Sequence, residues 1–336
     1  MNQIFSSALL EWPLLVCSLA IFGSSAFALM ASALFRPAGY PAANRVDRLW
    51  RILALVLTID APFALIDEVA RMAAVPFTSA PPFVIESLEL THVGRLWLWR
   101  LAIIALILIF AWAKLRARYF RIALLGALAA AMLILRCLSS HAIDRGAAAV
   151  AACVLHECAA ATWFGALSFL VCAASQAKTR DTFLAKAAPS ASTVAGWSVL
   201  VLVLSGLYMA WLALGLSAGN LIYTAYGRTL VVKVALFLVV LGAGGYNRYR
   251  LIPAIAAPDA RRMLMRNVTV ECVFLICVIG FAALLANTPP PHGHAGHHMA
   301  GMDMSNPAAV LRGRSELNCV DAPIFTVPLA AESVAR

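Results

Sequence analysis

The C-terminal part of the sequence alternates histidine with methionine, in the segment NTPPPHGHAGHHMAGMDMSN at 287–306. Within thirteen residues it holds His292, His294, His297, His298, Met299, Met302 and Met304. Short histidine-rich segments usually bind metal. Imidazole together with thioether favours copper over zinc, because zinc sites rarely use methionine. We therefore predict a copper-binding tail, and its glycine, alanine and proline content predicts a disordered one.

Further soft ligands lie in apolar segments. Cys137 and His141 are four residues apart, and Cys153 and His156 are three apart, so each pair shares one face of a helix. Thiolate and imidazole are ligands that Cu(I) prefers. A cysteine in an apolar segment is usually a packing residue, and His156 is equally well explained as a hydrogen bond between helices. We expect these four residues to contribute a copper site, with Cys153 as the second ligand beside His156.

The amino-acid composition indicates that the apolar segments carrying these cysteines and histidines lie in a membrane. Hydrophobic residues make up 62% of the 336 residues and charged residues 12%, against roughly 45–50% and about 25% in soluble proteins. The net charge of +10 comes from short basic clusters between apolar runs, which set membrane topology and argue against nucleic-acid binding. The sequence predicts an all-α transmembrane bundle.

About 20 apolar residues cross the bilayer, and eight segments satisfy this requirement. They lie near 9–35, 50–75, 95–114, 119–140, 147–175, 194–217, 229–248 and 266–287. Every second connection is rich in lysine and arginine, as between 36 and 51 or between 248 and 266. Basic residues mark the cytoplasmic side, so both termini are predicted outside. We expect a membrane domain at 1–287 and a periplasmic tail at 288–336.

The second predicted span carries three carboxylates. Asp60, Asp67 and Glu68 are spaced by seven and eight residues and so share one helical face. Ionisable groups at membrane depth are costly and usually face a bundle interior or a wet cavity. They are candidates either for ion pairs between helices or for binding cations and protons.

Several segments in order resemble the copper resistance D family (CopD, PcoD). They are THVGRLWLWR at 91–100, SSHA at 139–142, HECAAATWFGALSFL at 156–170, WSVLVLVLSGLY at 197–208, YGRTLVVKVALFLVVLGAGGYNRYRLIP at 226–253 and Glu271. The resemblance covers roughly residues 90–285 and implies an eight-span inner-membrane protein that handles copper. The membrane histidines of the family would correspond to His141 and His156. The chain lacks the CopC-like periplasmic copper-binding domain that some members carry.

Three functions are compatible with these residues. The first is copper transport across the cytoplasmic membrane, with a CopC-like chaperone as a possible donor and import as the expected direction. The second is a haem-binding oxidoreductase in which His141 and His156 hold the iron. The third is a copper receptor or assembly factor without transport. The sequence contains no GxxxxGK[ST] motif, so ATP-driven transport is not expected, and we do not expect an enzyme.

Overall fold

The computed structural model describes residues 2–34, 43–140, 142–174, 180–215 and 217–291. Every regular element in these ranges is helical, which confirms the predicted all-α fold. Eight of the helices are long and apolar enough to cross a membrane, as predicted. They are α1 (Asn2–Leu34), α2 (Ala43–Ala73), α4 (His92–Trp112), α5 (Arg118–Leu138), α6 (Ala147–Ala173), α7 (Arg180–Leu214), α9 (Ala225–Tyr246) and α10 (Pro258–Ala286). The chain is a multi-pass membrane protein.

The helices extend beyond the apolar segments from which they were predicted. Helix α7 begins at Arg180 rather than near 194, and α10 begins at Pro258 rather than near 266. Basic residues that were assigned to connections, such as Lys186 and Arg261, therefore lie on helices. Helical backbone keeps its peptide groups hydrogen-bonded through the interface, and long basic side chains reach the headgroups from there.

The described residues fall into two compact units. The larger unit contains residues 2–65 and 99–291, and the smaller contains 66–98. In the smaller unit, Arg71 pairs with Asp67 at 3.5 Å and with Glu68 at 2.5 Å. Two of the three carboxylates predicted on the second span thus form ion pairs within one helix. The predicted boundary at residue 288 stays a prediction, because 292–336 lie outside the described residues.

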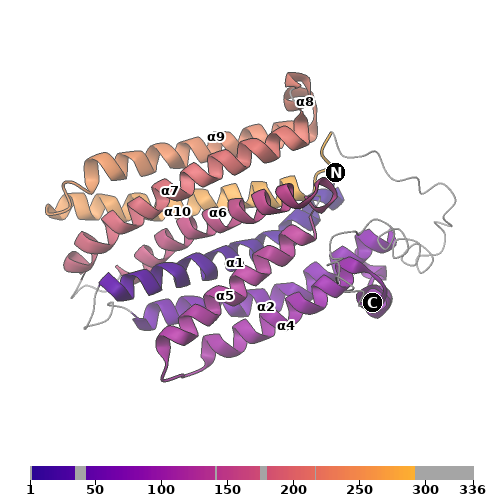
Figure 1. Ribbon diagram of the computed structural model, residues 1–336, viewed down its shortest axis with the longest axis horizontal. Helices are drawn as coiled ribbons and strands as arrows, with labels where there is room; N and C mark the ends of the chain where they lie inside the picture. Colours follow the sequence, from indigo (N-terminus) through magenta and orange to yellow (C-terminus); the bar gives the residue numbers. More distant parts are fainter. Residues whose placement is uncertain (1, 35–42, 141, 175–179, 216, 292–336) are drawn as a thin grey trace, which may run out of the picture. The chain divides into compact units, whose positions relative to one another are not determined.

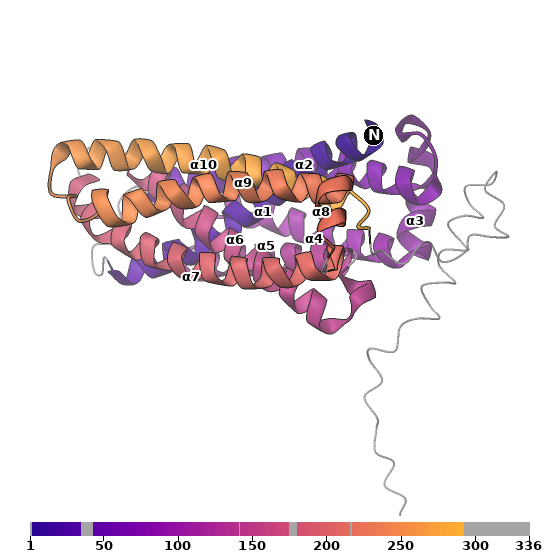
Figure 2. The same cartoon turned by 90° about the horizontal axis from the view of Figure 1, so that it is seen from above.

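Helix α1 is the centre of the larger unit. It packs against α5, α6 and α10 (Figure 1), and 72% of the residues in its most apolar window are buried, against 6% in α9. Helix α7 packs on α6, and α9 packs along α10 (Figure 2). Ser18, Ser24 and Ser32 of α1 donate their hydroxyl protons to carbonyls one turn earlier, so their burial leaves no unpaired polar group.

Helices α1 and α6 approach each other backbone to backbone. A Cβ atom added to Gly23 would lie 1.7 Å from the carbonyl oxygen of Ala161, and one added to Gly165 would lie 2.3 Å from the carbonyl carbon of Gly23. Small residues at such crossings are how membrane helices gain contact, since no hydrophobic effect joins them within lipid. We call this contact of Gly23, Ala161 and Gly165 the glycine seam.

Gly165→Ala should destabilise the protein by about 1–3 kcal/mol, because the seam has no room for a methyl group. Gly242→Ala is the matched control: nothing lies within 4 Å of its added Cβ, and alanine favours a helix over glycine by about 1 kcal/mol. Thermal unfolding of the detergent-solubilised protein measures both effects. Equal effects of the two substitutions would contradict the close approach.

Candidate metal centre

A tight connection between α5 and α6 brings two predicted ligands together. Cys137 lies in the last turn of α5, and Cys153 lies in the second turn of α6. Between them the chain passes through the 3₁₀ turn η3 (Ile143–Arg145) and Gly146, which has φ +90°. Residues with a side chain rarely adopt such a positive φ, so Gly146 is needed at this turn.

Two thiols and a carboxylate form one buried cluster. The Sγ atoms of Cys137 and Cys153 are 2.7 Å apart, and both cysteines are free. With Glu157, one turn further along α6, they offer three ligand atoms within 4.8 Å of one another. All three residues are buried. The predicted ligands Cys137 and Cys153 are thus brought together, and Glu157 joins them.

The carboxylate of Glu157 is only half satisfied. Its Oε1 accepts a hydrogen bond from Arg136, whereas its Oε2 is buried without a hydrogen-bond partner. Buried polar atoms in native proteins almost always have a partner, so an unpaired one indicates a missing water or ion. The cluster of Cys137, Cys153 and Glu157 therefore fits a cation that binds thiolate and carboxylate.

Arg136 links this cluster, which lies on α5 and α6, to two other helices. Its guanidinium donates to Glu157 on α6 and, from Nε, to Glu11 on α1 over 2.9 Å. The other oxygen of Glu11 accepts from the side-chain amide of Asn287, at the end of α10, over 2.7 Å. An arginine with two carboxylates can be buried because charge and hydrogen bonds are both satisfied. The network fixes the geometry of the cluster.

Two more cations act on the cluster. Arg100 of α4 and Lys233 of α9 both interact electrostatically with Glu157. Arg100 also donates to the hydroxyl of Ser139 over 3.1 Å. Lys233 also interacts electrostatically with Cys153, so positive charges from α4 and α9 act on the buried cluster in addition to Arg136.

A small cavity adjoins the network. Its volume is about 30 Å³, and its polar walls are Glu11, Ser18, Arg100 and Arg136. A water molecule needs about 10–15 Å³ and several polar partners, and this cavity offers both. Water can therefore solvate the charged side of the cluster.

His156 faces a different helix. Its Nδ1 lies 3.0 Å from the hydroxyl of Ser205 on α7, and its ring packs against Gly206. The Ser205 hydroxyl gives its single proton to the carbonyl of Val201 at 2.6 Å, so it accepts from Nδ1. This tautomer leaves the lone pair on Nε2. His156 is not part of the three-residue cluster, so Cys153 is grouped with Cys137 and Glu157 instead.

Other predicted ligands are not described. His141 and the tail residues from His292 to Met304 lie outside the described residues, so neither the tail site nor the His141–His156 pair of the alternative haem site is located. Asp60 of α2 lies within the larger unit and has a buried Oδ2 without a hydrogen-bond partner. Asp67 and Glu68, by contrast, form ion pairs with Arg71.

Comparison with known families decides the relationship. Residues 185–285 match the family described as Copper resistance protein D, and residues 5–150 match Copper resistance protein D-like, N-terminal domain. The chain belongs to the copper resistance protein D family. No curated protein and no solved structure matches it.

As a copper resistance protein D family member, the chain is a membrane protein that handles copper. The likeness extends further towards the N-terminus than the predicted 90–285, because the second match starts at residue 5. It includes Glu11, Arg136 and Cys137, whereas Cys153 and Glu157 lie between the two matched regions. The sequence signal for Glu157 as a ligand was its i+4 spacing from Cys153.

Arg136→Met should destabilise this copper resistance protein by about 3–5 kcal/mol, because two largely buried carboxylates lose their counter-charge. The double substitution Arg136→Met/Glu157→Gln should recover part of the loss. Chemical or thermal unfolding measures both changes. The exposed pair Arg262–Asp259 is the control, and Arg262→Ala should have little effect. A double variant no more stable than the single one would contradict the network.

Proposed function

We propose that the chain imports copper across the cytoplasmic membrane, with Cys137, Cys153 and Glu157 as its entry site. The single observation that carries this proposal is the buried cluster of two thiols and a half-satisfied carboxylate. Membership of a copper resistance family supports copper as the substrate. Thiolates suit Cu(I), which is a soft cation, so we infer that this oxidation state is carried.

The local charges favour a monovalent ion. With both thiols deprotonated, the cysteines, Glu11 and Glu157 carry four negative charges, and Arg136, Arg100 and Lys233 carry three positive ones. One Cu(I) cancels the remaining negative charge. A neutral loaded site reduces the cost of holding a metal ion within the membrane.

His156 is the proposed next ligand along the path. It lies one turn beyond Cys153 on α6 and has its Nε2 lone pair free of the bond to Ser205. A histidine whose other nitrogen is held in place is the usual arrangement for metal binding. His141, which follows α5 in the sequence, and the His/Met tail are proposed to deliver copper to Cys137 from the periplasm or from a CopC-like donor.

Cys137→Ser and Cys153→Ser should each lower the Cu(I) affinity of the membrane site by at least about 10–100-fold, the range for disturbing a supporting contact. Competition with a Cu(I) chelator, on protein lacking 292–336, isolates this site from the tail. Cys277→Ser, at an exposed position of α10, is the control.

His156→Ala should abolish copper uptake into vesicles. If His156 only joins helices, uptake survives and stability falls by about 0.6 kcal/mol; surviving uptake would remove His156 from the path.

The proposed direction requires the tail and the entry site on the outer side of the inner membrane. A phosphatase that is active only in the periplasm should therefore be active when it is fused after Ala286. A fluorescent protein that is fluorescent only in the cytoplasm should be fluorescent when it is fused within 248–262. Paired fusions of both reporters at both positions measure this. A cytoplasmic signal after Ala286 would reverse the topology and rule out collection of periplasmic copper by the tail.

A further inference from the structure

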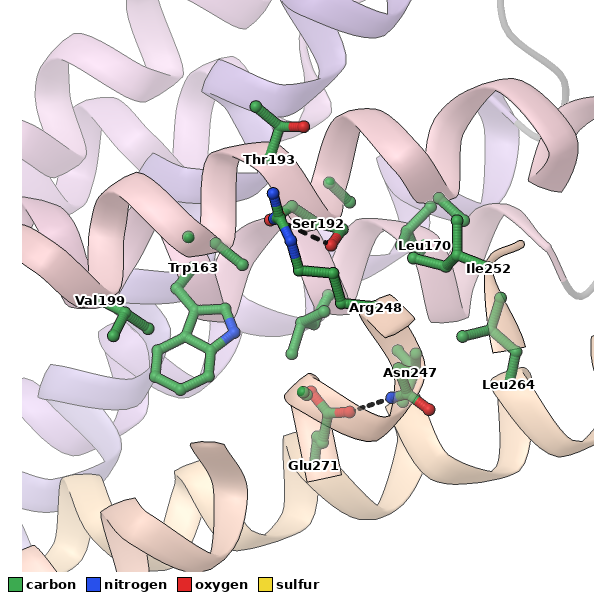
Figure 3. Close-up of a pocket in the computed structure, with 18 of the residues that line it drawn as sticks. Trp163, Leu170, Ser192, Thr193, Val199, Asn247, Arg248, Ile252, Leu264 and Glu271 are labelled. Carbon is green, nitrogen blue, oxygen red and sulfur yellow. Dashed lines mark hydrogen bonds between the residues drawn. The ribbon is translucent and has the colours of Figure 1, made fainter. Parts of the chain in front are cut away.

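A second cavity lies further along α6 than the entry site. Its volume is about 490 Å³, and it is bounded by α6, α7, α10 and the end of α9, which continues into the π-helical turn η4 (Asn247–Leu251) (Figure 3). The α6 residues in the cavity wall run from Trp163 to Leu170, which is about 9–20 Å of helix beyond Glu157. The basic cluster at 248–266 is at this end of the bundle, so the positive-inside rule makes it the inner end.

Glu271 of α10 is the buried acid of this cavity. It is 2% exposed, and its Oε1 accepts a hydrogen bond from the side-chain amide of Asn247. The side-chain amide of Asn267 donates a hydrogen bond to the Oδ1 atom of Asn247 over 3.1 Å and so holds the Asn247 side chain in place. Among the described residues, Glu271 forms no ion pair, in contrast to Glu157 with Arg136.

The π-helical turn accounts for this arrangement. A π-helical turn inserts one extra residue in a helix and is often found at functional sites. Here Asn247 begins the turn and faces Glu271, while Arg248 lies at the other side of the cavity (Figure 3). Arg248 donates to the carbonyl and hydroxyl oxygens of Ser192 over 2.7 and 3.3 Å, so it is engaged away from Glu271.

The surroundings of Glu271 limit what it can bind. The titratable groups in the described wall are Arg248, Tyr249 and Glu271, and Cys272 follows Glu271 on α10. An ionised carboxylate at membrane depth is costly without a cation, so the group needs a bound cation or a proton. Carboxylate and amide oxygens are poor ligands for Cu(I). A proton needs only one carboxylate oxygen, and the Oε2 atom of Glu271 is not used by the hydrogen bond from Asn247.

We propose that Glu271 is a proton-binding site, open to the inner side through this cavity, whose protonation is coupled to copper movement. The coupling rests on the proposed transport function, whereas the binding of a proton by Glu271 does not. The Glu271 carboxyl takes up its proton from water that reaches it through the cavity and releases the proton to that water.

Carbodiimide labelling tests the proton site without copper. Dicyclohexylcarbodiimide adds as a whole molecule to a protonated carboxyl in apolar surroundings and does not add to an ionised one. In the full chain in lipid vesicles, Glu271 should be labelled, labelling should weaken as pH rises, and Glu271→Gln should abolish it. Glu157, paired with Arg136, is the internal control and should stay unlabelled. Absence of label on Glu271, measured by peptide mass spectrometry, would overturn the proposal.

Copper flux tests the coupling. In vesicles with the membrane potential clamped at zero, an imposed pH gradient should change the rate of Cu(I) uptake by the wild-type protein. Glu271→Gln should show the same rate with and without the gradient, while Cu(I) binding at Cys137 and Cys153 is unchanged. A variant that responds to the gradient as the wild type does would overturn the coupling. A wild-type protein that carries no copper but is labelled at Glu271 would reject transport and keep the proton site.

Discussion

A charge buried away from bulk water must be compensated by neighbouring groups, and Arg136 is the residue on which this constraint falls most heavily. It satisfies Glu11 and Glu157, and Glu11 is also bound by Asn287, so one guanidinium joins α1, α5, α6 and α10. The same side chain is next to Cys137 in sequence and bonded to the carboxylate beside Cys153. The ligands of the proposed entry site are therefore positioned by the interaction that holds the bundle together.

The two buried glutamates show how compensation determines chemistry. Glu157 has a permanent cation on one oxygen and two thiols within 4.8 Å of its carboxylate, which suits a soft metal ion. Glu271 has only an amide on one oxygen and a cavity beside it, which suits an ion that comes and goes. The residue type is identical, and the difference comes from the neighbouring helices.

Much of the fold was predictable because hydropathy is a local property. All eight spans were predicted from runs of apolar residues. The helix ends were not predicted correctly, because the helices continue beyond the apolar residues into the membrane interface. Cys137 and Cys153 were predicted as ligands, but Cys153 was assigned to His156 because the sequence shows only which residues share a face of one helix. Glu157 was not included, although its i+4 spacing puts it on the face of Cys153, because the sequence does not show that Cys137 of α5 lies beside that face. The pairing of Asn247 with Glu271 depends on a π-helical turn, for which the sequence offered no signal.

The glycine seam has a mechanical consequence. Gly23 and Gly165 bring two backbones into contact without side chains between them. At this crossing α1 and α6 have no side-chain rotamer that could change to let one helix shift against the other. The entry-site residues Cys153 and Glu157 lie on α6, one of these two helices. Helix α9, which is scarcely buried and packs mainly along α10, is held by far fewer contacts. For the proposed transport, we therefore expect the change of access from one side of the membrane to the other to involve the periphery of the bundle more than its centre.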